Sequence, residues 1–258
     1  MAAITLIGSG NTATALGKAL IRAGHSIAQV WSRDEEHAKT LGDILGTNYT
    51  ADISNVTKEA DIYLVTVRDD AIESVAGTFS AGDKIVAHTS GIRSKDLLQI
   101  AGPNYGIFYP NVSMTKGVEV DFTKVLLMIE GSNEDTVASL KSLADTITSN
   151  ARIIDEKQRQ SFHVASVFAN NFTNRMYIAT EQILLDSGMS FEDIRPLIAS
   201  HLQTLMQQSP TRLQTGPAIR HDETAIDSHL RLIQRYPALH DIYINMTSSI
   251  QEWQKTNS

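Results

Sequence analysis

The segment that decides the fold is Ile4-Thr5-Leu6-Ile7-Gly8-Ser9-Gly10-Asn11-Thr12-Ala13, close to the start of the chain. Its apolar beginning predicts a buried strand, and the glycines after it predict a tight turn into a helix. Gly8 suits such a turn, Gly10 leaves room for a phosphate beside the backbone, and Ala13 lets the helix pack closely on the strand. The N–H groups that begin this helix, at residues 11–13, would face an anion.

A second apolar run, Ile27-Ala28-Gln29-Val30-Trp31, follows at the distance that a dinucleotide-binding unit requires. Ser32 and Arg33 come directly after it, where a carboxylate would bind the ribose hydroxyls of NAD. An arginine at this position can instead pair with the 2′-phosphate of NADP. Asp34, one position further on, complicates the choice because it is a carboxylate close to the ribose position, but it can also simply cap the next helix. The sequence therefore favours NADP over NAD. The expected cofactor contacts in this part of the chain are Gly8, Ser9, Gly10, Asn11, Thr12, Ala13, Ser32 and Arg33.

The composition is that of a globular protein with a proper core. The 258 residues are 42% hydrophobic and 20% charged, enough for one large or two modest domains. A net charge of -7 argues against a nucleic-acid partner, because phosphate backbones require a basic face. The absence of cysteine excludes disulfides, thiol nucleophiles and cysteine-bound zinc. We expect no metal, since no histidine pair has the spacing of a helical metal site.

The chain shows no targeting signal. The first strand is expected almost at Met1, with no basic leader before it, and no apolar run is long enough to cross a bilayer. We therefore expect a cytoplasmic protein without a membrane partner.

Strand and helix signals alternate through the first 155 residues. Apolar runs predict further strands near residue 49 and over 62–67, 84–88, 105–109, 125–129 and 152–154. Helices are expected between them, over about 34–45, 69–79 and 133–149. This alternation predicts an α/β fold with a doubly wound Rossmann-type sheet and right-handed crossovers.

Strand signals stop after Asp155. Residues 156–186 space their apolar side chains by three and four, which predicts one long helix that ends at Gly188. Further helices are expected over about 190–208, 222–235 and 237–254. We therefore divide the chain into a nucleotide-binding domain, 1–155, and a helical domain for substrate binding and dimerisation, 156–258.

Ligands of open parallel sheets bind beyond the carboxyl ends of the strands. Val67 and Arg68 follow one such strand, and their backbone is expected near the ribose or pyrophosphate of a cofactor. Asp70 is either a helix cap or a cofactor contact. Ser90, in the segment His88-Thr89-Ser90-Gly91, is expected near the nicotinamide, with a plain polar turn as the alternative.

The long helix supplies the remaining polar candidates. His163 and the asparagines 170, 171 and 174 lie apart from its phenylalanine stripe. Asparagines in an apolar helix need hydrogen-bond partners, which are a substrate carbonyl or imine, a neighbouring helix, or a dimer partner. His163 is either a proton donor and acceptor or a structural histidine. The candidate catalytic residues are Ser90, His163 and Asn171.

The same helix predicts an assembly. Val164, Val167, Phe168 and Phe172 widen its apolar stripe beyond a single face. A helix that is apolar on most sides must be surrounded, and a second copy of the chain is the simplest way to surround it. We therefore expect a homodimer formed mainly by residues after Asp155.

These features together resemble a known family. Gly8-x-Gly10-Asn11-x-Ala13, His88-Thr89-Ser90-Gly91, the 163–171 helix and Thr215-Gly216-Pro217-x-x-Arg220-x-Asp222 are similar to uncharacterised Rossmann-type NADP oxidoreductases with a C-terminal helical domain. The resemblance extends over essentially the whole chain. The N-terminal half is also similar to pyrroline-5-carboxylate reductase and to deazaflavin-dependent NADP reductases. The resemblance implies the two-domain layout and a dimer through the helical domain.

Three positions depart from related proteins. Tyr109-Pro110 stands where the family usually has His-Pro, and Arg220-His221-Asp222 stands where it usually has Arg-Gly-Asp. The 3-hydroxy-acid dehydrogenases of this architecture carry a lysine four residues before an asparagine of the long helix. Here Ser166 and Val167 occupy those positions, which argues against that chemistry.

Two functions from different classes remain open. The first is an NADP(H)-dependent oxidoreductase that transfers a hydride to or from a small carbonyl or imine compound. The second is an NADP(H)-binding sensor or interaction protein without turnover. Oxidation of NADPH across a panel of candidate substrates distinguishes them.

Overall fold

The structure, a computed structural model, describes residues 1–257. Its contacts divide the chain into two compact units, the first from Met1 to Asn170 and the second from Asn171 onward. Each unit is described by itself.

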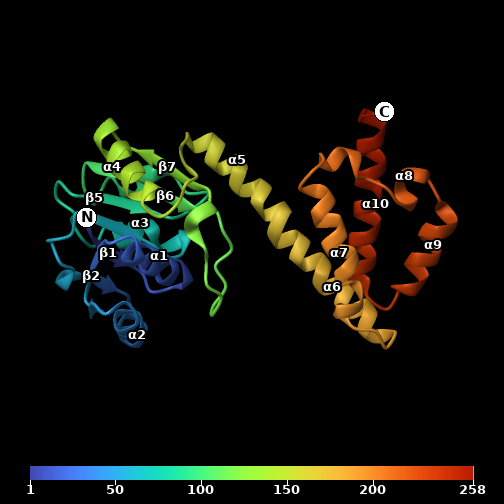
Figure 1. The fold of residues 1–258 in the computed structure, drawn as a ribbon, viewed down its shortest axis with the longest axis horizontal. Helices are drawn as coiled ribbons and strands as arrows, with labels where there is room; N and C mark the ends of the chain where they lie inside the picture. Colours follow the sequence, from blue (N-terminus) through green and yellow to red (C-terminus); the bar gives the residue numbers. More distant parts are fainter. Residues whose placement is uncertain (258) are drawn as a thin grey trace. The chain divides into compact units, whose positions relative to one another are not determined.

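The first unit is built on one eight-stranded sheet, whose strand order is β3-β2-β1-β4-β5-β6-β7-β8. The order reverses between β1 and β4, which is the switch point where ligands of such sheets bind. The doubly wound α/β fold expected from the sequence is thus confirmed (Figure 1). The strands are β1 (Ala3–Ile7), β2 (Ser26–Trp31), β3 (Asn48–Thr50), β4 (Ile62–Val65), β5 (Ile85–His88), β6 (Asn104–Pro110), β7 (Leu127–Gly131) and β8 (Ala151–Ile153).

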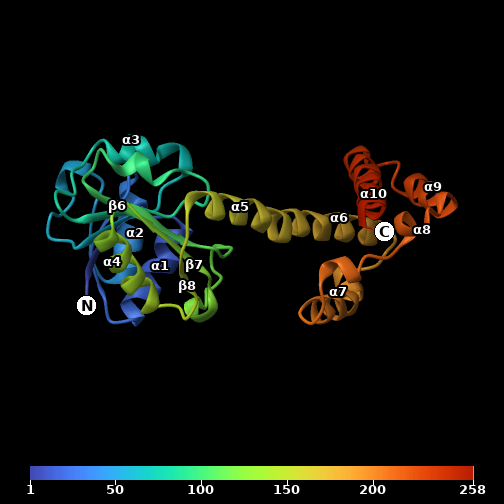
Figure 2. The ribbon, with the colours of Figure 1, turned by 90° about the horizontal axis from the view of Figure 1, so that it is seen from above.

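Helices cover both faces of this sheet (Figure 2). Alternate residues of each strand point to opposite faces, so Ile4 and Leu6 of β1 join one core while Ile7 joins the other. The first core is completed by α1 (Asn11–Arg22), α2 (Glu35–Leu45) and α4 (Glu134–Asp145). The second is completed by α3 (Ile72–Ala76) and by 3-10 turns, among them η1 (Ile53–Asn55) and η3 (Lys95–Leu98). The other 3-10 turns of this unit are η2 (Asp69–Ala71) and η4 (Phe122–Lys124).

The strand β7 runs antiparallel to β6, whereas the other neighbouring strands pair in parallel. An antiparallel neighbour needs no crossover helix. The connection between the two strands, residues 111–126, therefore starts and ends at the carboxyl edge of β6. This is the edge where the parallel strands of the sheet present their ligand-binding loops.

The helix expected over 156–186 is interrupted. It consists of α5 (Glu156–Ser166), a π-helical segment η5 (Val167–Phe172) and α6 (Thr173–Asp186). A π segment holds an extra residue per turn, so side chains on either side of it leave the common stripe that an uninterrupted α-helix would have. The expected asparagines Asn170 and Asn171 lie within this segment.

The second unit is entirely helical in its described part. Within it α6 packs against α7, and α8 contacts both α9 and α10 (Figure 1). Asp222 caps α9, because its carboxylate accepts the backbone N–H of Ala225. Of the helices that the structure describes, none has the length and hydropathy needed to span a membrane. The helices after α6 are α7 (Phe191–Leu205), η6 (Pro210–Arg212), α8 (Pro217–Arg220), α9 (Glu223–Leu232) and α10 (Pro237–Asn257).

Candidate functional site

The glycine turn after β1 has the geometry that the sequence motif requires. Gly8 has a φ of 126°, which favours glycine, and a Cβ on it would lie 2.6 Å from Oγ1 of Thr66. A Cβ on Gly10 would have no atom within 4 Å. The backbone at Gly10 is therefore open to a bound group, while Gly8 fixes the turn against β4.

The helix α1 begins without a side-chain cap at Gly10. Asn11, the first helical residue, turns its side chain away from this role, because its Nδ2 donates to the carbonyl of Met114 at 2.9 Å. The N–H groups of the first turn lack intrahelical partners in any helix and need an acceptor. Together with the helix dipole, they form a site for an anion such as a pyrophosphate.

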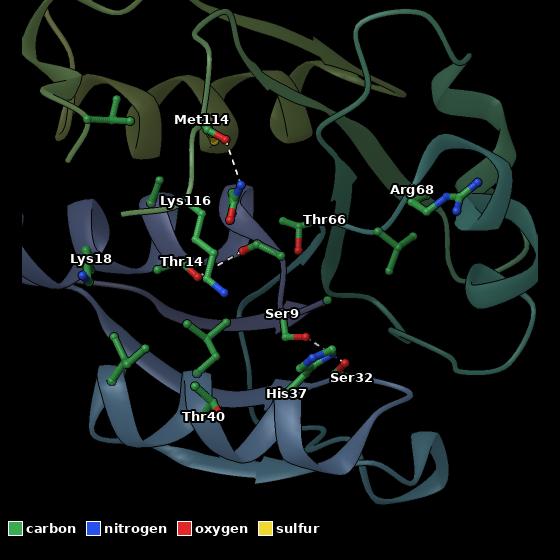
Figure 3. Close-up of a pocket in the computed structure, with 18 of the residues that line it drawn as sticks. Ser9, Thr14, Lys18, Ser32, His37, Thr40, Thr66, Arg68, Met114 and Lys116 are labelled. Carbon is green, nitrogen blue, oxygen red and sulfur yellow. Dashed lines mark hydrogen bonds between the residues drawn. The ribbon is translucent and has the colours of Figure 1, made fainter. Parts of the chain in front are cut away.

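A cavity of about 970 Å³ opens over this turn (Figure 3). Four segments of the first unit surround it: the glycine turn with α1, the end of β2 with α2, the end of β4 with η2 and α3, and residues 114–120 of the β6–β7 connection. It lies at the ends of β2 and β4, at the switch point of the strand order, where doubly wound sheets hold dinucleotides.

The cavity is basic although the chain as a whole is acidic. Among the described residues that line it, only Glu119 is acidic. The basic residues of its lining are Lys18, Arg22, Arg33, His37, Arg68 and Lys116, although the side chain of Arg68 is directed away from the cavity centre (Figure 3). Such a concentration of positive charge, in a chain with a net charge of -7, fits an anionic ligand. The open backbone at Gly10 and this charge are what a dinucleotide needs, so the residues present fit an NAD(P)-type cofactor.

Most of the expected cofactor contacts lie on this cavity. Those that line it are Gly8, Ser9, Gly10, Asn11, Ser32, Arg33, Val67 and Arg68. Thr12 and Ala13 do not line it, and Ala13 is fully buried in the core between α1 and the sheet. The end of β2 is fixed to the glycine turn, since Oγ of Ser9 donates to Oγ of Ser32 at 2.8 Å.

The sequence left the roles of Asp34 and Asp70 open, and the structure shows what each carboxylate contacts. Asp34 caps α2, because its carboxylate accepts the N–H of His37. Asp70 caps no helix; its carboxylate accepts Nε and a terminal nitrogen of Arg68, the latter at 2.9 Å. Figure 3 shows the Arg68 side chain directed away from the cavity centre. The guanidinium charge of Arg68 is therefore paired with Asp70 and lies away from the cavity centre.

The buried His88 holds the turn that follows β5. Its Nδ1 accepts the N–H of Ser90 at 3.1 Å, so Nε2 carries the proton and donates to the carbonyl of Ser94 at 3.1 Å. Burial lowers the pKa of His88 to about 4. A neutral imidazole with a fixed tautomer is therefore part of the structure of this turn.

The side chain of Ser90 takes part in the same turn. Its Oγ accepts the N–H groups of Ile92 and Arg93 at 3.2 and 3.1 Å. Its carbonyl accepts a guanidinium N–H of Arg159 at 3.2 Å. Ser90 is buried, and these bonds give it the polar-turn geometry that the sequence left open as an alternative.

Arg159 and Glu130 form a buried ion pair that sequence analysis did not identify. Nε of Arg159 lies 2.5 Å from Oε1 of Glu130, and the arginine side chain is 0% exposed. Its remaining terminal nitrogen has no partner within the described residues. Removing one partner of such a pair strongly destabilises the folded protein, because the other charge is left buried and unpaired. The one sequence signal was Glu130, an acidic residue inside the apolar run of β7.

A second polar cluster joins α5 to the end of β6. The hydroxyl of Tyr109 donates to Oδ1 of Asn111 at 3.0 Å and lies 3.0 Å from Nδ1 of His163. Ser166 Oγ lies 2.9 Å from the same Oδ1. Because the tyrosine proton is given to Asn111, the tyrosine oxygen accepts Nδ1–H of His163. Nε2 of His163 is not used in this hydrogen bond, so it is the ring nitrogen that can exchange a proton with another group.

Gly91 brings this cluster against the turn after β5. A Cβ at Gly91 would collide with Nδ1 of His163 and lie 2.8 Å from Cζ of Tyr109. The ring centres of Tyr109 and His163 are 5.9 Å apart in an edge-to-face arrangement. The structure thus unites His163 with the Ser90-Gly91 turn within the first unit. Asn171 is exposed in the π-helical segment, at the start of the second unit.

Residues 1–257 contain no group of three His, Asp or Glu side chains that could hold a metal ion.

Comparison with known proteins places the chain in a family. It is 38% identical to a protein from Bacteroides fragilis whose solved structure is named "putative NADP oxidoreductase BF3122". The match covers 97% of this chain and 98% of the other, with a TM-score of 0.91. The chain therefore belongs to the Rossmann-type NADP oxidoreductase family, and the resemblance expected from its motifs is confirmed.

Family models agree with this placement. Residues 3–90 match the model described as "NADP oxidoreductase coenzyme F420-dependent", and residues 125–250 match "Domain of unknown function (DUF2520)". No curated protein matches the sequence.

More distant solved structures share the fold. A reductive aminase from Aspergillus terreus, in complex with NADPH and ethyl levulinate, is 14% identical with a TM-score of 0.78, over 98% of this chain and 93% of that one. A 1-pyrroline-5-carboxylate reductase from Streptococcus pyogenes is 16% identical with a TM-score of 0.68, over 96% and 98%.

Proposed function

We propose that this protein is an NADP(H)-dependent oxidoreductase that transfers a hydride to or from a small carbonyl or imine compound. The observation that carries the proposal is the basic cavity over the uncapped start of α1, with Arg33 at the end of β2. The family membership supports the reaction class. The reductive aminase and the pyrroline-5-carboxylate reductase, which share the fold, support a carbonyl or imine as the reacting group.

The proposed cofactor is NADP. Arg33 lines the cavity directly after Ser32, at the position that reads the adenosine ribose. A guanidinium there suits the dianionic 2′-phosphate better than the hydroxyls of NAD. When bound, the cofactor supplies or accepts the hydride at its nicotinamide. We place the nicotinamide end toward the turn at Ser90, two strands along the carboxyl edge from β1.

The protein has to supply the proton that accompanies the hydride. We propose the imidazolium form of His163 for this role: its Nδ1–H stays bonded to the Tyr109 oxygen, while Nε2–H gives its proton to the substrate nitrogen or oxygen, which leaves the neutral Nδ1–H tautomer. Burial raises the pKa of the Tyr109 hydroxyl, which keeps the phenol protonated as a hydrogen-bond donor. We propose that Ser90 holds the turn after β5 in place beside the substrate through its hydrogen bonds to Ile92, Arg93 and Arg159.

The proposed assembly is a homodimer through the helical region. Among the described residues after 155, the buried apolar side chains are Ala218, Ile226, Ile233 and Leu239. Large apolar side chains are exposed there in greater number; Val164 is 49% exposed, Leu197 66% and Leu185 62%. Apolar surface of this extent marks an interaction site, and a two-fold dimer is its commonest form. Light scattering at micromolar concentration tests this, and a mass of 28.3 kDa at every concentration would show a monomer.

The experiment that tests the function combines binding and turnover. NADPH binding is measured first, and NADPH oxidation is then followed with keto acids, cyclic imines and a deazaflavin. Turnover with a carbonyl or imine compound supports the proposal. Turnover with the deazaflavin alone would show that the substrate is a deazaflavin and not a small carbonyl or imine compound. Tight NADPH binding without turnover on any member of the panel would favour the alternative, a sensor that binds the cofactor without reaction.

A further inference from the structure

Residues 111–121, which we name the strap, cross the basic cavity from the β6 side. The cavity lining includes the consecutive strap residues from Met114 to Val120. The loop can reach this position because β7 is antiparallel to β6, which keeps the connection at the carboxyl edge. In a sheet with a parallel β7, a crossover would take the chain to the opposite edge.

The strap is tied to α1 at two points. At the start of the helix, Asn11 donates to the carbonyl of Met114 at 2.9 Å. At its end, Arg22 pairs with Glu119. Next to these ties, Met114 and Val120 pack against the core. The segment is therefore held along α1, over the place where the first turn of the helix presents its N–H groups.

Lys116 lies between the two ties and points into the cavity. Figure 3 shows its side chain reaching from the strap toward Thr14 on α1. Arg22 and Arg68 also line the cavity, but they are neutralised by Glu119 and Asp70. Lys116 has no salt bridge to any described acidic residue. An unpaired ammonium held over a helix N-terminus is an arrangement that favours a phosphate.

We propose that Lys116 is a phosphate ligand of the bound dinucleotide, supplied from the strap rather than from the glycine turn or from β2. This inference rests on the proposed function, since it takes NAD(P) as the occupant of the cavity. The cofactor would then be held from two sides: the backbone of α1 and Arg33 on one, and Lys116 on the other. The strap would also shield the phosphates from solvent.

The test is calorimetric titration of NADPH and NADH into the wild-type chain, Lys116→Ala and the control Lys124→Ala. Lys124 is an exposed lysine of the same connection that does not line the cavity. Lys116→Ala should weaken NADPH binding about 10-fold, with Lys124→Ala unchanged. An equal loss for NADH assigns the contact to the pyrophosphate, and a loss for NADPH alone assigns it to the 2′-phosphate. Unchanged affinity for both cofactors in Lys116→Ala would overturn the inference.

A second readout does not depend on the variant. Trypsin cleavage after Lys116 should slow when NADPH is added to the wild-type chain, while cleavage after the exposed Lys58, outside the cavity, should not. An unchanged rate of cleavage after Lys116 in saturating NADPH would contradict the inference. If the wild-type chain bound neither NADPH nor NADH, the proposed function itself would be wrong. Failure of the Lys116 inference and failure of the proposed function are therefore distinguishable.

Discussion

The hydroxyl of Tyr109, at the end of β6, lies 3.0 Å from Nδ1 of His163 in α5. This contact joins residues that are far apart in the sequence, and it orients the imidazole beside the turn at Gly91. The proposed proton chemistry therefore depends on a histidine that a tyrosine holds in place.

Replacing Tyr109 with phenylalanine removes the hydroxyl that holds His163. We expect NADPH affinity to stay unchanged and turnover to fall about 10-fold or more, because a positioned acid contributes on the order of 10²–10⁴ in rate. The loss of one hydrogen bond should cost about 1 kcal/mol of stability. Nitrogen NMR of His163 provides the readout of tautomer, with Nδ1–H dominant in the wild type. A wild-type tautomer that persists in Tyr109→Phe would show that the tyrosine does not orient the ring.

Gly91→Ala tests the same cluster from the other side. The added Cβ would collide with the imidazole of His163 and the ring of Tyr109, and should destabilise the protein by about 1–3 kcal/mol. Turnover should fall while NADPH still binds, since Gly91 does not line the cofactor cavity. Gly77→Ala is the matched control, because its Cβ would meet nothing closer than 3.6 Å. Equal unfolding curves for the two variants would refute the packing described here.

Arg33→Ala probes cofactor choice. Binding of NADPH should weaken by about 1.5–3 kcal/mol, the scale of a hydrogen bond to a charged group, with NADH nearly unchanged. Fluorescence titration with both cofactors measures the difference. Equal losses for NADPH and NADH would exclude a 2′-phosphate contact for Arg33.

The stability of the fold should depend on pH through His88. Its pKa in the folded chain is about 4, below the ordinary 6.5, so the unfolded chain binds more protons between these values. Stability should rise across this pH window, by up to about 3 kcal/mol, and level off above it. In His88→Gln, which cannot titrate but keeps an N–H donor, denaturant unfolding should lose that part of the slope. An unchanged slope would show that His88 does not carry the linkage.

The fold of the first unit was predictable because its signals are local. The apolar strand, glycine turn and helix around Gly8 and Gly10, with a second strand at the required distance, predict a dinucleotide-binding unit. The direction of β7 was not predictable, since an apolar run such as Leu127–Gly131 reads the same in a parallel or an antiparallel strand. The strap and Lys116 were missed for this reason, because their position depends on that direction.

The contacts around α5 were hidden for a different reason. Arg159 stands in the polar segment Glu156-Lys157-Gln158-Arg159-Gln160, where the pattern indicates a solvated helix face. Its burial depends on Glu130, a residue of the sheet that pairs with it only in the folded chain. The partner of His163 was hidden in the same way, because no local pattern links an imidazole to Tyr109. The π-helical segment also escaped, since its residues fit a regular apolar helix.

The measurement that tests the account most directly is a titration of the wild-type chain with NADPH and NADH, followed by the fluorescence of Trp31. This tryptophan is buried at the end of β2 and lines the basic cavity. The only other tryptophan, Trp253, lies in α10, and Trp31→Phe identifies its contribution. We predict saturable quenching of Trp31 by both cofactors, with the tighter dissociation constant for NADPH. The absence of saturable quenching by either cofactor, with calorimetry silent as well, would contradict the central claim that this cavity holds a nicotinamide dinucleotide.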